Sequence, residues 1–230
     1  MSVIENIRQV KACLEKAAVK VGRNPDEIKL LAVTKTHPVA IIETALANGI
    51  EFIAENRLQE AEKKLPELEG KFKEFHFIGH LQSNKIKKLM QLNPTLIHSI
   101  DNLKTAQKLN DYLMLYNRKQ NILIQVNTSG EASKFGIEPA DTKNFVQAIS
   151  RLSQLHVRGL MTIGKLTDNQ TEIRRCFQLL HSLFEELKSE ELPHVEMKYL
   201  SMGMSGDYQL AIAEGANIVR LGSAIFGARN

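Results

Sequence analysis

A lysine follows a short aliphatic run near the amino terminus of this sequence. Residues Leu30-Leu31-Ala32-Val33-Thr34 lead to Lys35, and Pro38 comes shortly after. Such a run, closed by a proline, is typical of a buried parallel strand that turns into a helix. Side chains alternate along a strand, so Leu31, Val33 and Lys35 would share one face. Burial favours the neutral amine, which can form a Schiff base with an aldehyde. The plainer alternative is a lysine that reaches from the strand end into solvent.

Two loops rich in glycine and serine could bind a phosphate group. Residues 201–205 read Ser-Met-Gly-Met-Ser, and residues 220–223 read Arg-Leu-Gly-Ser. Small residues let backbone N–H groups approach a phosphate, serine hydroxyls add donors, and a following helix presents its positive end. Arg220 could reach the same cavity as Lys35, although a surface arginine is the alternative. A phosphate anchor beside a buried amine would suit pyridoxal 5′-phosphate (PLP).

Three histidines lie in or just after two further apolar runs: His76, His80 and His98. They lack the close spacing with acids or thiols that metal sites show, so no metal is predicted and hydrogen-bonded core or cavity histidines are favoured. Lys134, in the long loop 127–137, would either contact a ligand at the cavity mouth or be solvated.

Short apolar runs alternate with amphipathic segments along the whole chain, which predicts strands and helices in turn. The strands are expected at 30–35, 50–54, 75–80, 96–100, 121–126, 156–161, 195–200 and 217–221, and the helices at 2–21, 39–47, 58–68, 82–90, 103–116, 139–152, 169–187 and 208–213, with a last short turn before Asn230. Eight such repeats fit a (β/α)8 barrel of the α/β class, with an extra amino-terminal helix, better than an open doubly wound sheet. No linker divides them, so residues 1–230 should form one domain. In such a barrel, chemistry gathers at the carboxyl ends of the strands, and phosphate binds at the loops after strands 7 and 8.

The composition is that of an ordinary globular protein, with 43% hydrophobic and 24% charged residues. No apolar run approaches the roughly 18 residues that span a bilayer, and the first residues lack a signal-peptide pattern, so a cytoplasmic protein without a membrane partner is expected. Cys13 and Cys176 form no CxxC pair and should be reduced thiols.

The net charge of +4 is a weak hint of an anionic ligand. The densest basic cluster is Lys85, Lys87 and Lys88. Because no aromatic residues interleave with these lysines, a solvated helix face is favoured, and no nucleic-acid partner is predicted.

Several ordered motifs resemble those of the YggS/PROSC family of pyridoxal phosphate homeostasis proteins, which look like the amino-terminal barrel of fold-type III alanine racemases. The resemblance covers nearly the whole chain. Its motifs are Ala32-Val33-Thr34-Lys35-Thr36, Glu55-Asn56-Arg57-Leu58-Gln59-Glu60, His76-Phe77-Ile78-Gly79-His80-Leu81-Gln82-Ser83-Asn84-Lys85, Ser129-Gly130-Glu131-Ala132-Ser133-Lys134, Gly159-Leu160-Met161-Thr162-Ile163, Ser201-Met202-Gly203-Met204-Ser205 and Arg220-Leu221-Gly222-Ser223-Ala224-Ile225-Phe226-Gly227-Ala228-Arg229.

The resemblance implies a set of cofactor-binding residues. Lys35 would form the Schiff base with PLP, Asn56 would lie beside the cofactor, Arg220 would face the pyridine nitrogen, and Ser205, Gly222 and Ser223 would hold the phosphate. Two positions depart from the family pattern. Ala54 replaces the glycine that usually precedes Glu55-Asn56, and His37 stands where some members carry a second lysine.

The same resemblance favours a carrier over an enzyme. An arginine cannot give up its proton to the pyridine nitrogen, so the ring would be a weak electron sink. Alanine racemases also use a tyrosine from a carboxyl-terminal β domain, whereas this sequence ends at Asn230, just after the last predicted strand. We therefore expect PLP homeostasis, by buffering or by delivery to PLP-dependent apoenzymes, with no established catalytic residue. The alternatives are a single-domain amino-acid racemase or related PLP enzyme, and an aldolase-type barrel that uses Lys35 on another carbonyl.

Overall fold

The eight predicted aliphatic runs form the strands of a closed parallel barrel, in which each strand pairs with its neighbours in chain order and β1 pairs with β8. This arrangement comes from a computed structural model that describes residues 2–131 and 133–227. The strands are β1 (Lys29–Val33), β2 (Phe52–Glu55), β3 (Glu74–Phe77), β4 (Leu96–Ile100), β5 (Gln120–Gln125), β6 (Leu155–Met161), β7 (Val195–Ser201) and β8 (Ile218–Leu221). The prediction of a (β/α)8 barrel is confirmed.

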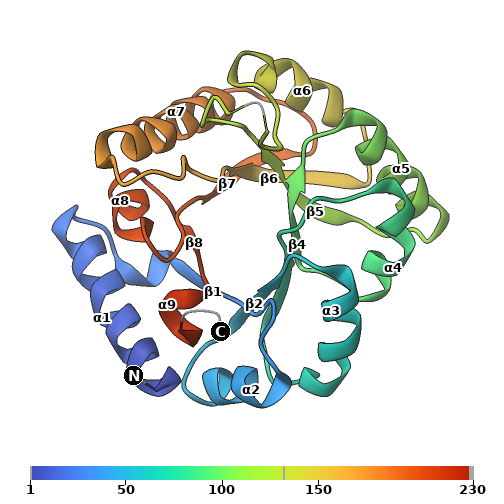
Figure 1. The fold of residues 1–230 in the computed structure, drawn as a ribbon. Helices are drawn as coiled ribbons and strands as arrows, with labels where there is room; N and C mark the ends of the chain where they lie inside the picture. Colours follow the sequence, from blue (N-terminus) through green and yellow to red (C-terminus); the bar gives the residue numbers. More distant parts are fainter. Residues whose placement is uncertain (1, 132, 228–230) are drawn as a thin grey trace.

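Helices surround the barrel on its outside (Figure 1). They are α1 (Val3–Lys20), α2 (Val39–Ala47), α3 (Leu58–Lys64), α4 (Ile86–Gln91), α5 (Leu103–Leu115), α6 (Thr142–Ile149), α7 (Gln170–Lys188), α8 (Tyr208–Ala213) and α9 (Ser223–Phe226). The predicted extra helix, α1, packs against α2, α8 and α9. The last helix, α9, has only four residues, and α1 beside it adds Ile7, Val10, Leu14 and Ala18 to the core.

The apolar core has two compartments. Alternate strand residues point outward and pack under the helices, while a smaller set points inward and fills the barrel. The inner set is Leu31, Val33, Ala54, Leu96, Leu123, Met161 and Ile218, with Phe52, Ile78 and Tyr199 packed against it. The face that the sequence predicted for Leu31 and Val33 is therefore the barrel interior.

Two strands end two or more residues earlier than the sequence predicted. β1 ends at Val33 rather than reaching Lys35, because Thr36 adopts a left-handed conformation (φ 67°) that turns the chain away. β3 ends at Phe77 rather than at His80, because Gly79 lies directly against the backbone of Asn56 and leaves the ladder. Both irregular segments lie at the carboxyl ends of their strands.

Some helices are also shorter than predicted. The segment expected to be helical to about Leu68 ends at Lys64, and Pro66 starts a separate 3-10 turn over Pro66–Leu68, since proline lacks the N–H that would continue the helix. The predicted helix 82–90 begins as a 3-10 turn, Ser83–Lys85, before α4.

Parts of two predicted motifs lie outside the described residues: Ala132 of the motif in the loop after β5, and Ala228 and Arg229 of the last motif. Within 2–131 and 133–227, no helix combines the length and apolar character needed to cross a bilayer.

Candidate functional site

All six residues that the sequence singled out for binding line one cavity of about 360 Å³ at the carboxyl ends of the strands. Its lining is Val33, Lys35, Asn56, Ile78, Met161, Ile163, Met204, Ser205, Gly206, Arg220, Gly222 and Ser223; we refer to it as the Lys35 cavity. Lys35 is half-buried rather than fully buried. Its apolar lining includes Val33 and Met161 of the inner set and Ile78, which packs against that set. The polar groups come from the loops after β1, β2, β7 and β8 and, for Arg220, from β8 itself. This size and mixed lining are typical of a site for a small molecule.

Donors converge at one side of the Lys35 cavity. The backbone N–H groups of Gly222 and Ala224 both donate to Ser205 Oγ, at 3.3 and 3.1 Å. The loop that carries Ser205 is held in turn by Asp207, whose carboxylate accepts from Met204 N. Here the serine oxygen accepts from both N–H groups; the Ser205 hydroxyl proton, and the two N–H groups once a phosphate oxygen replaces the serine oxygen as their acceptor, are donors of the kind that phosphate sites use.

Arg220, in β8, is a buried charged residue that lines the Lys35 cavity. Its side chain is only 4% exposed, and it donates from Nη1 to Ser201 Oγ and from Nη2 to Thr162 O, both at 2.7 Å. Burial lowers its pKa to about 10, which the nearby Asp207 carboxylate partly opposes. The guanidinium therefore stays charged at neutral pH and presents donors only.

Asn56 contributes a hydrogen-bond acceptor to the same cavity. Its Oδ1 is buried and has no hydrogen-bond partner among the described residues, although the side chain lines the Lys35 cavity. A buried polar atom without a partner is unusual, because desolvation of such an atom costs about 1–3 kcal/mol. The position fits a ligand group that completes the hydrogen bonding there.

The residue before Lys35 is anchored by a buried ion pair. Thr34 Oγ1 donates to Glu55 Oε1 at 2.9 Å, and Lys64 Nζ donates to both Glu55 Oε1 and Thr34 O, at 2.8 and 2.9 Å. Glu55 is 1% exposed and Lys64 is 13% exposed. Burial raises the pKa of Glu55, against the lowering effect of the Lys64 and Thr34 hydrogen bonds.

The residue after Lys35 is anchored by the same lysine through a second acid. Thr36 N donates to Glu60 Oε2 at 2.6 Å, and Lys64 Nζ donates to that oxygen at 2.7 Å. A β-branched residue with positive φ is strained, and such strain persists only where neighbouring groups hold it. Glu55, Glu60 and Lys64 thus position Lys35 from both sides. The motif around Asn56 contains both acids, but no role was predicted for them or for Lys64.

Ser201 corrects a detail of the predicted phosphate loop. The sequence grouped its hydroxyl with the phosphate donors after strand 7, whereas Ser201 is the last residue of β7, fully buried inside the barrel. Strand alternation accounts for this, because Tyr199, two residues earlier, also packs against the inner set. Its hydroxyl bonds Arg220 and His98 instead.

His76 and His98 are hydrogen-bonded core histidines. His76 Nδ1 lies 2.8 Å from His98 Nε2, His76 Nε2 lies 2.8 Å from Glu74 Oε2, and His98 Nδ1 lies 3.0 Å from Ser201 Oγ. Burial lowers the pKa of His76, against the raising effect of the Glu74 carboxylate. Burial lowers the pKa of His98 well below 6.5, and nearby His76 and Arg220 add to that effect. Both rings are therefore neutral at pH 7.

We expect these histidines to make stability depend on pH. Below about pH 6.5 the unfolded chain binds protons at His98 that the folded chain excludes, so the free energy of unfolding falls as the pH is lowered. In His98→Leu, this decline between pH 6.5 and 5 should be shallower by up to about 1.4 kcal/mol per pH unit. Urea unfolding of both proteins across this range is the measurement. Parallel curves for the two proteins would contradict a neutral buried His98.

The remaining candidates lie outside the Lys35 cavity lining. His80 stacks on Phe135 with ring centroids 4.1 Å apart, and Lys134 Nζ bonds Glu131 and Gly164 O, which ties the loops after β5 and β6 together. His37, at the position of a second lysine in some family members, packs against Phe226.

Comparisons with known proteins extend over every element of the barrel. A family model described as alanine racemase, N-terminal domain, matches residues 3–230. A pyridoxal phosphate homeostasis protein of Aquifex aeolicus is 39% identical over 229 residues, which cover 100% of this chain and 99% of that protein. The solved structure of PipY from Synechococcus elongatus with PLP bound is 34% identical, with a TM-score of 0.79, covering 94% of this chain and 100% of that one. An alanine racemase from Clostridium difficile has a TM-score of 0.70 over 98% of this chain and 56% of its own, at 14% identity, which shows a shared fold alone.

Proposed function

Because this chain belongs to the family of pyridoxal phosphate homeostasis proteins, we propose that it binds PLP in the Lys35 cavity and acts in PLP homeostasis. One observation carries the proposal. A single cavity brings together a lysine, a buried arginine, and a serine on which two backbone N–H groups converge. These are the groups that an aldehyde, a pyridine nitrogen and a phosphate require. The PLP-bound PipY structure, 34% identical over nearly its whole length, supports the same ligand.

The roles follow from the chemistry of each residue. Lys35 would hold the aldehyde carbon of PLP as a Schiff base, with release of water. Ser205, Gly222 and Ser223 would bind the phosphate. Asn56 would offer its unsatisfied Oδ1 beside the ring, and Arg220 would face the pyridine nitrogen.

Arg220 makes buffering or delivery of PLP a better proposal than strong catalysis. Its guanidinium keeps its proton at neutral pH, so it can donate a hydrogen bond to the pyridine nitrogen without protonating it. The cofactor supplies an electron sink when bound, and an unprotonated ring nitrogen weakens that sink. We assign no catalytic residue.

We further propose that residues 1–230 form one PLP-binding domain and that the protein works in the cytoplasm. PLP-dependent apoenzymes would be the recipients of the cofactor. Cys13 and Cys176 are free thiols, which supports a reducing compartment.

We expect purified protein incubated with PLP to gain a visible absorbance band that borohydride abolishes, leaving a mass adduct on the peptide that contains Lys35. Lys35→Ala should form no adduct there and bind PLP at least about tenfold more weakly, since only the non-covalent contacts remain. Lys63→Ala, which removes an exposed lysine of α3, is the matched control and should behave as the parent. A parent that takes up no PLP, or an adduct on another lysine, would disprove the proposal.

A further inference from the structure

A continuous chain of hydrogen bonds crosses the inside of the barrel and ends on Arg220. It starts at Glu74, the first residue of β3, and passes through His76 of β3, His98 of β4 and Ser201 of β7. Its last bond joins Ser201 to Arg220 of β8 at 2.7 Å. We refer to these five residues as the inner chain. They connect the amino-terminal end of the barrel to the wall of the Lys35 cavity.

We propose that the inner chain is a hydrogen-bond chain of fixed direction, and that Ser201, His98, His76 and Glu74 act as positioning residues for Arg220. The inference rests on the proposed function, because it gives Arg220 a cofactor to face. It goes beyond that function by assigning a role to four residues, none of which lines the Lys35 cavity.

The two ends of the inner chain set its direction. A guanidinium can only donate hydrogen bonds, and an ionised carboxylate can only accept them. The hydrogen bonds from His76 and Lys29 lower the pKa of Glu74 to about 2, so Glu74 is ionised at neutral pH. Lys29 Nζ lies 2.5 Å from the other carboxylate oxygen of Glu74, Oε1.

Each group between these ends then has one available arrangement. Ser201 Oγ accepts from Arg220, so its hydroxyl proton goes to His98 Nδ1. His98 must therefore carry its own proton on Nε2, which donates to His76 Nδ1. His76 in turn carries its proton on Nε2 and donates to Glu74 Oε2. Every donor points from Arg220 towards Glu74.

An added proton does not fit this arrangement. If His98 were protonated at Nδ1, Ser201 Oγ would receive two donors, and its own hydroxyl proton would lose its acceptor. If His76 were protonated at Nδ1, that proton would meet the proton on His98 Nε2. The charged and titratable groups that face His98 are His76 and Arg220, and those that face His76 are Glu74, Lys29 and His98.

The consequence for the Lys35 cavity is a fixed guanidinium. Ser201 is committed as an acceptor towards Arg220, and Thr162 O accepts from the second terminal nitrogen, so two bonds set the plane of the group. A serine that could turn its hydroxyl towards Arg220 would lose that bond. Buried hydrogen-bonded chains of this kind strengthen each member and favour one geometry.

The first test reads the proton positions directly. Imidazole ¹⁵N spectra of the full protein should show His76 and His98 each with a bare Nδ1 and a protonated Nε2, without change between pH 8 and 6. A cationic ring, or a proton on Nδ1 of either ring, would overturn the fixed direction. This reading needs no cofactor.

The second test separates positioning from mere core packing. His98→Leu should bind PLP roughly tenfold more weakly and shift the absorbance band of the bound cofactor, while borohydride still traps PLP on Lys35. If this variant does not fold, Ser201→Ala should give the same two effects. Glu51→Gln removes a carboxylate from the same end of the barrel, one that pairs with Lys73 on the surface, and should match the parent.

The outcomes distinguish the two proposals. A parent that takes up no PLP disproves the proposed function, and this inference with it. A parent that binds PLP, beside a His98→Leu variant with unchanged affinity and absorbance, disproves the inner chain alone.

Discussion

Gly79→Ala is expected to destabilise the protein by about 3 kcal/mol and to weaken PLP binding at the same time. A Cβ at this position would lie 2.0 Å from the backbone oxygen of Asn56 and 2.7 Å from its carbonyl carbon. Neither atom is the end of a flexible side chain, so the backbone just after β2 or just after β3 must move. The φ angle of Gly79 lies outside the left-handed region, so the effect arises from the close approach and not from conformational strain.

The same movement would reach the Lys35 cavity, because Asn56 lines it. Urea unfolding measures the stability, and PLP titration measures the binding. Gly206→Ala is the matched control for stability, since a Cβ there meets nothing within 4 Å and its φ is not positive. A Gly79→Ala protein whose free energy of unfolding lies within about 0.5 kcal/mol of the parent would contradict the close approach.

The sequence predicted the barrel well because strands of a (β/α)8 fold are continuous aliphatic runs. Leu96–Ile100 was predicted to the residue, as were the helices Val39–Ala47 and Tyr208–Ala213. The fold then located the cavity residues in advance, because Lys35 and Arg220 lie near the carboxyl ends of β1 and β8, which pair directly. Their roles in binding remain predictions.

What the sequence did not predict depends on contacts between distant residues. Lys64 and Glu60 form an ordinary i,i+4 pair of a helix, which can be recognised in a sequence. That Lys64 also reaches Thr34, thirty positions earlier, follows only once β1 and β2 lie side by side. The inward direction of the Ser201 side chain likewise depends on the register of β7. A shift of one residue along the strand would turn this side chain to the outside of the barrel.

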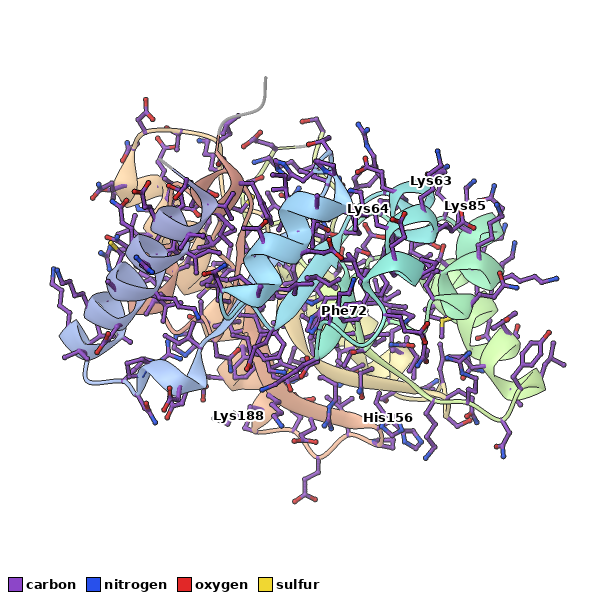
Figure 2. All side chains as sticks on the ribbon, turned by 90° about the horizontal axis from the view of Figure 1, so that it is seen from below. Lys63, Lys64, Phe72, Lys85, His156 and Lys188 are labelled. Carbon is purple, nitrogen blue, oxygen red and sulfur yellow. The ribbon has the colours of Figure 1, made fainter. Side chains whose placement is uncertain are left out.

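Lys64→Met is expected to cost about 3 kcal/mol of stability at pH 7 and to slow the capture of PLP by Lys35. Glu55 would keep its hydrogen bond from Thr34 but lose the cation that compensates its buried charge. The loop around Lys35 would also lose its bond from Lys64 to Thr34 O. Figure 2 labels Lys64 on α3, in the same half of the molecule as Lys85 and away from His156 and Lys188.

The sign of the pH dependence of stability in Lys64→Met distinguishes the loss of the Glu55–Lys64 ion pair from a general packing defect. Burial already raises the pKa of Glu55, and loss of Lys64 would raise it further. A carboxyl group whose pKa is raised on folding binds its proton more tightly in the folded state. The stabilisation from this proton is therefore complete when the pH is below the pKa that the group has in the unfolded chain. It is lost as the pH rises through the pKa that the group has in the folded protein. The deficit of Lys64→Met should thus be smaller at pH 5 than at pH 7.

Two further variants isolate the ion pair. Glu55→Gln combined with Lys64→Met should recover much of the lost stability, because no charge is then left buried. Lys71→Met removes a lysine whose partner, Glu43, is about as exposed as itself, so it should cost less than about 1 kcal/mol. If Lys64→Met were no more costly than Lys71→Met, or if its deficit did not change with pH, the buried pair would not be what anchors Thr34. Lys35 would then owe its position to the Glu60 contact with Thr36 alone.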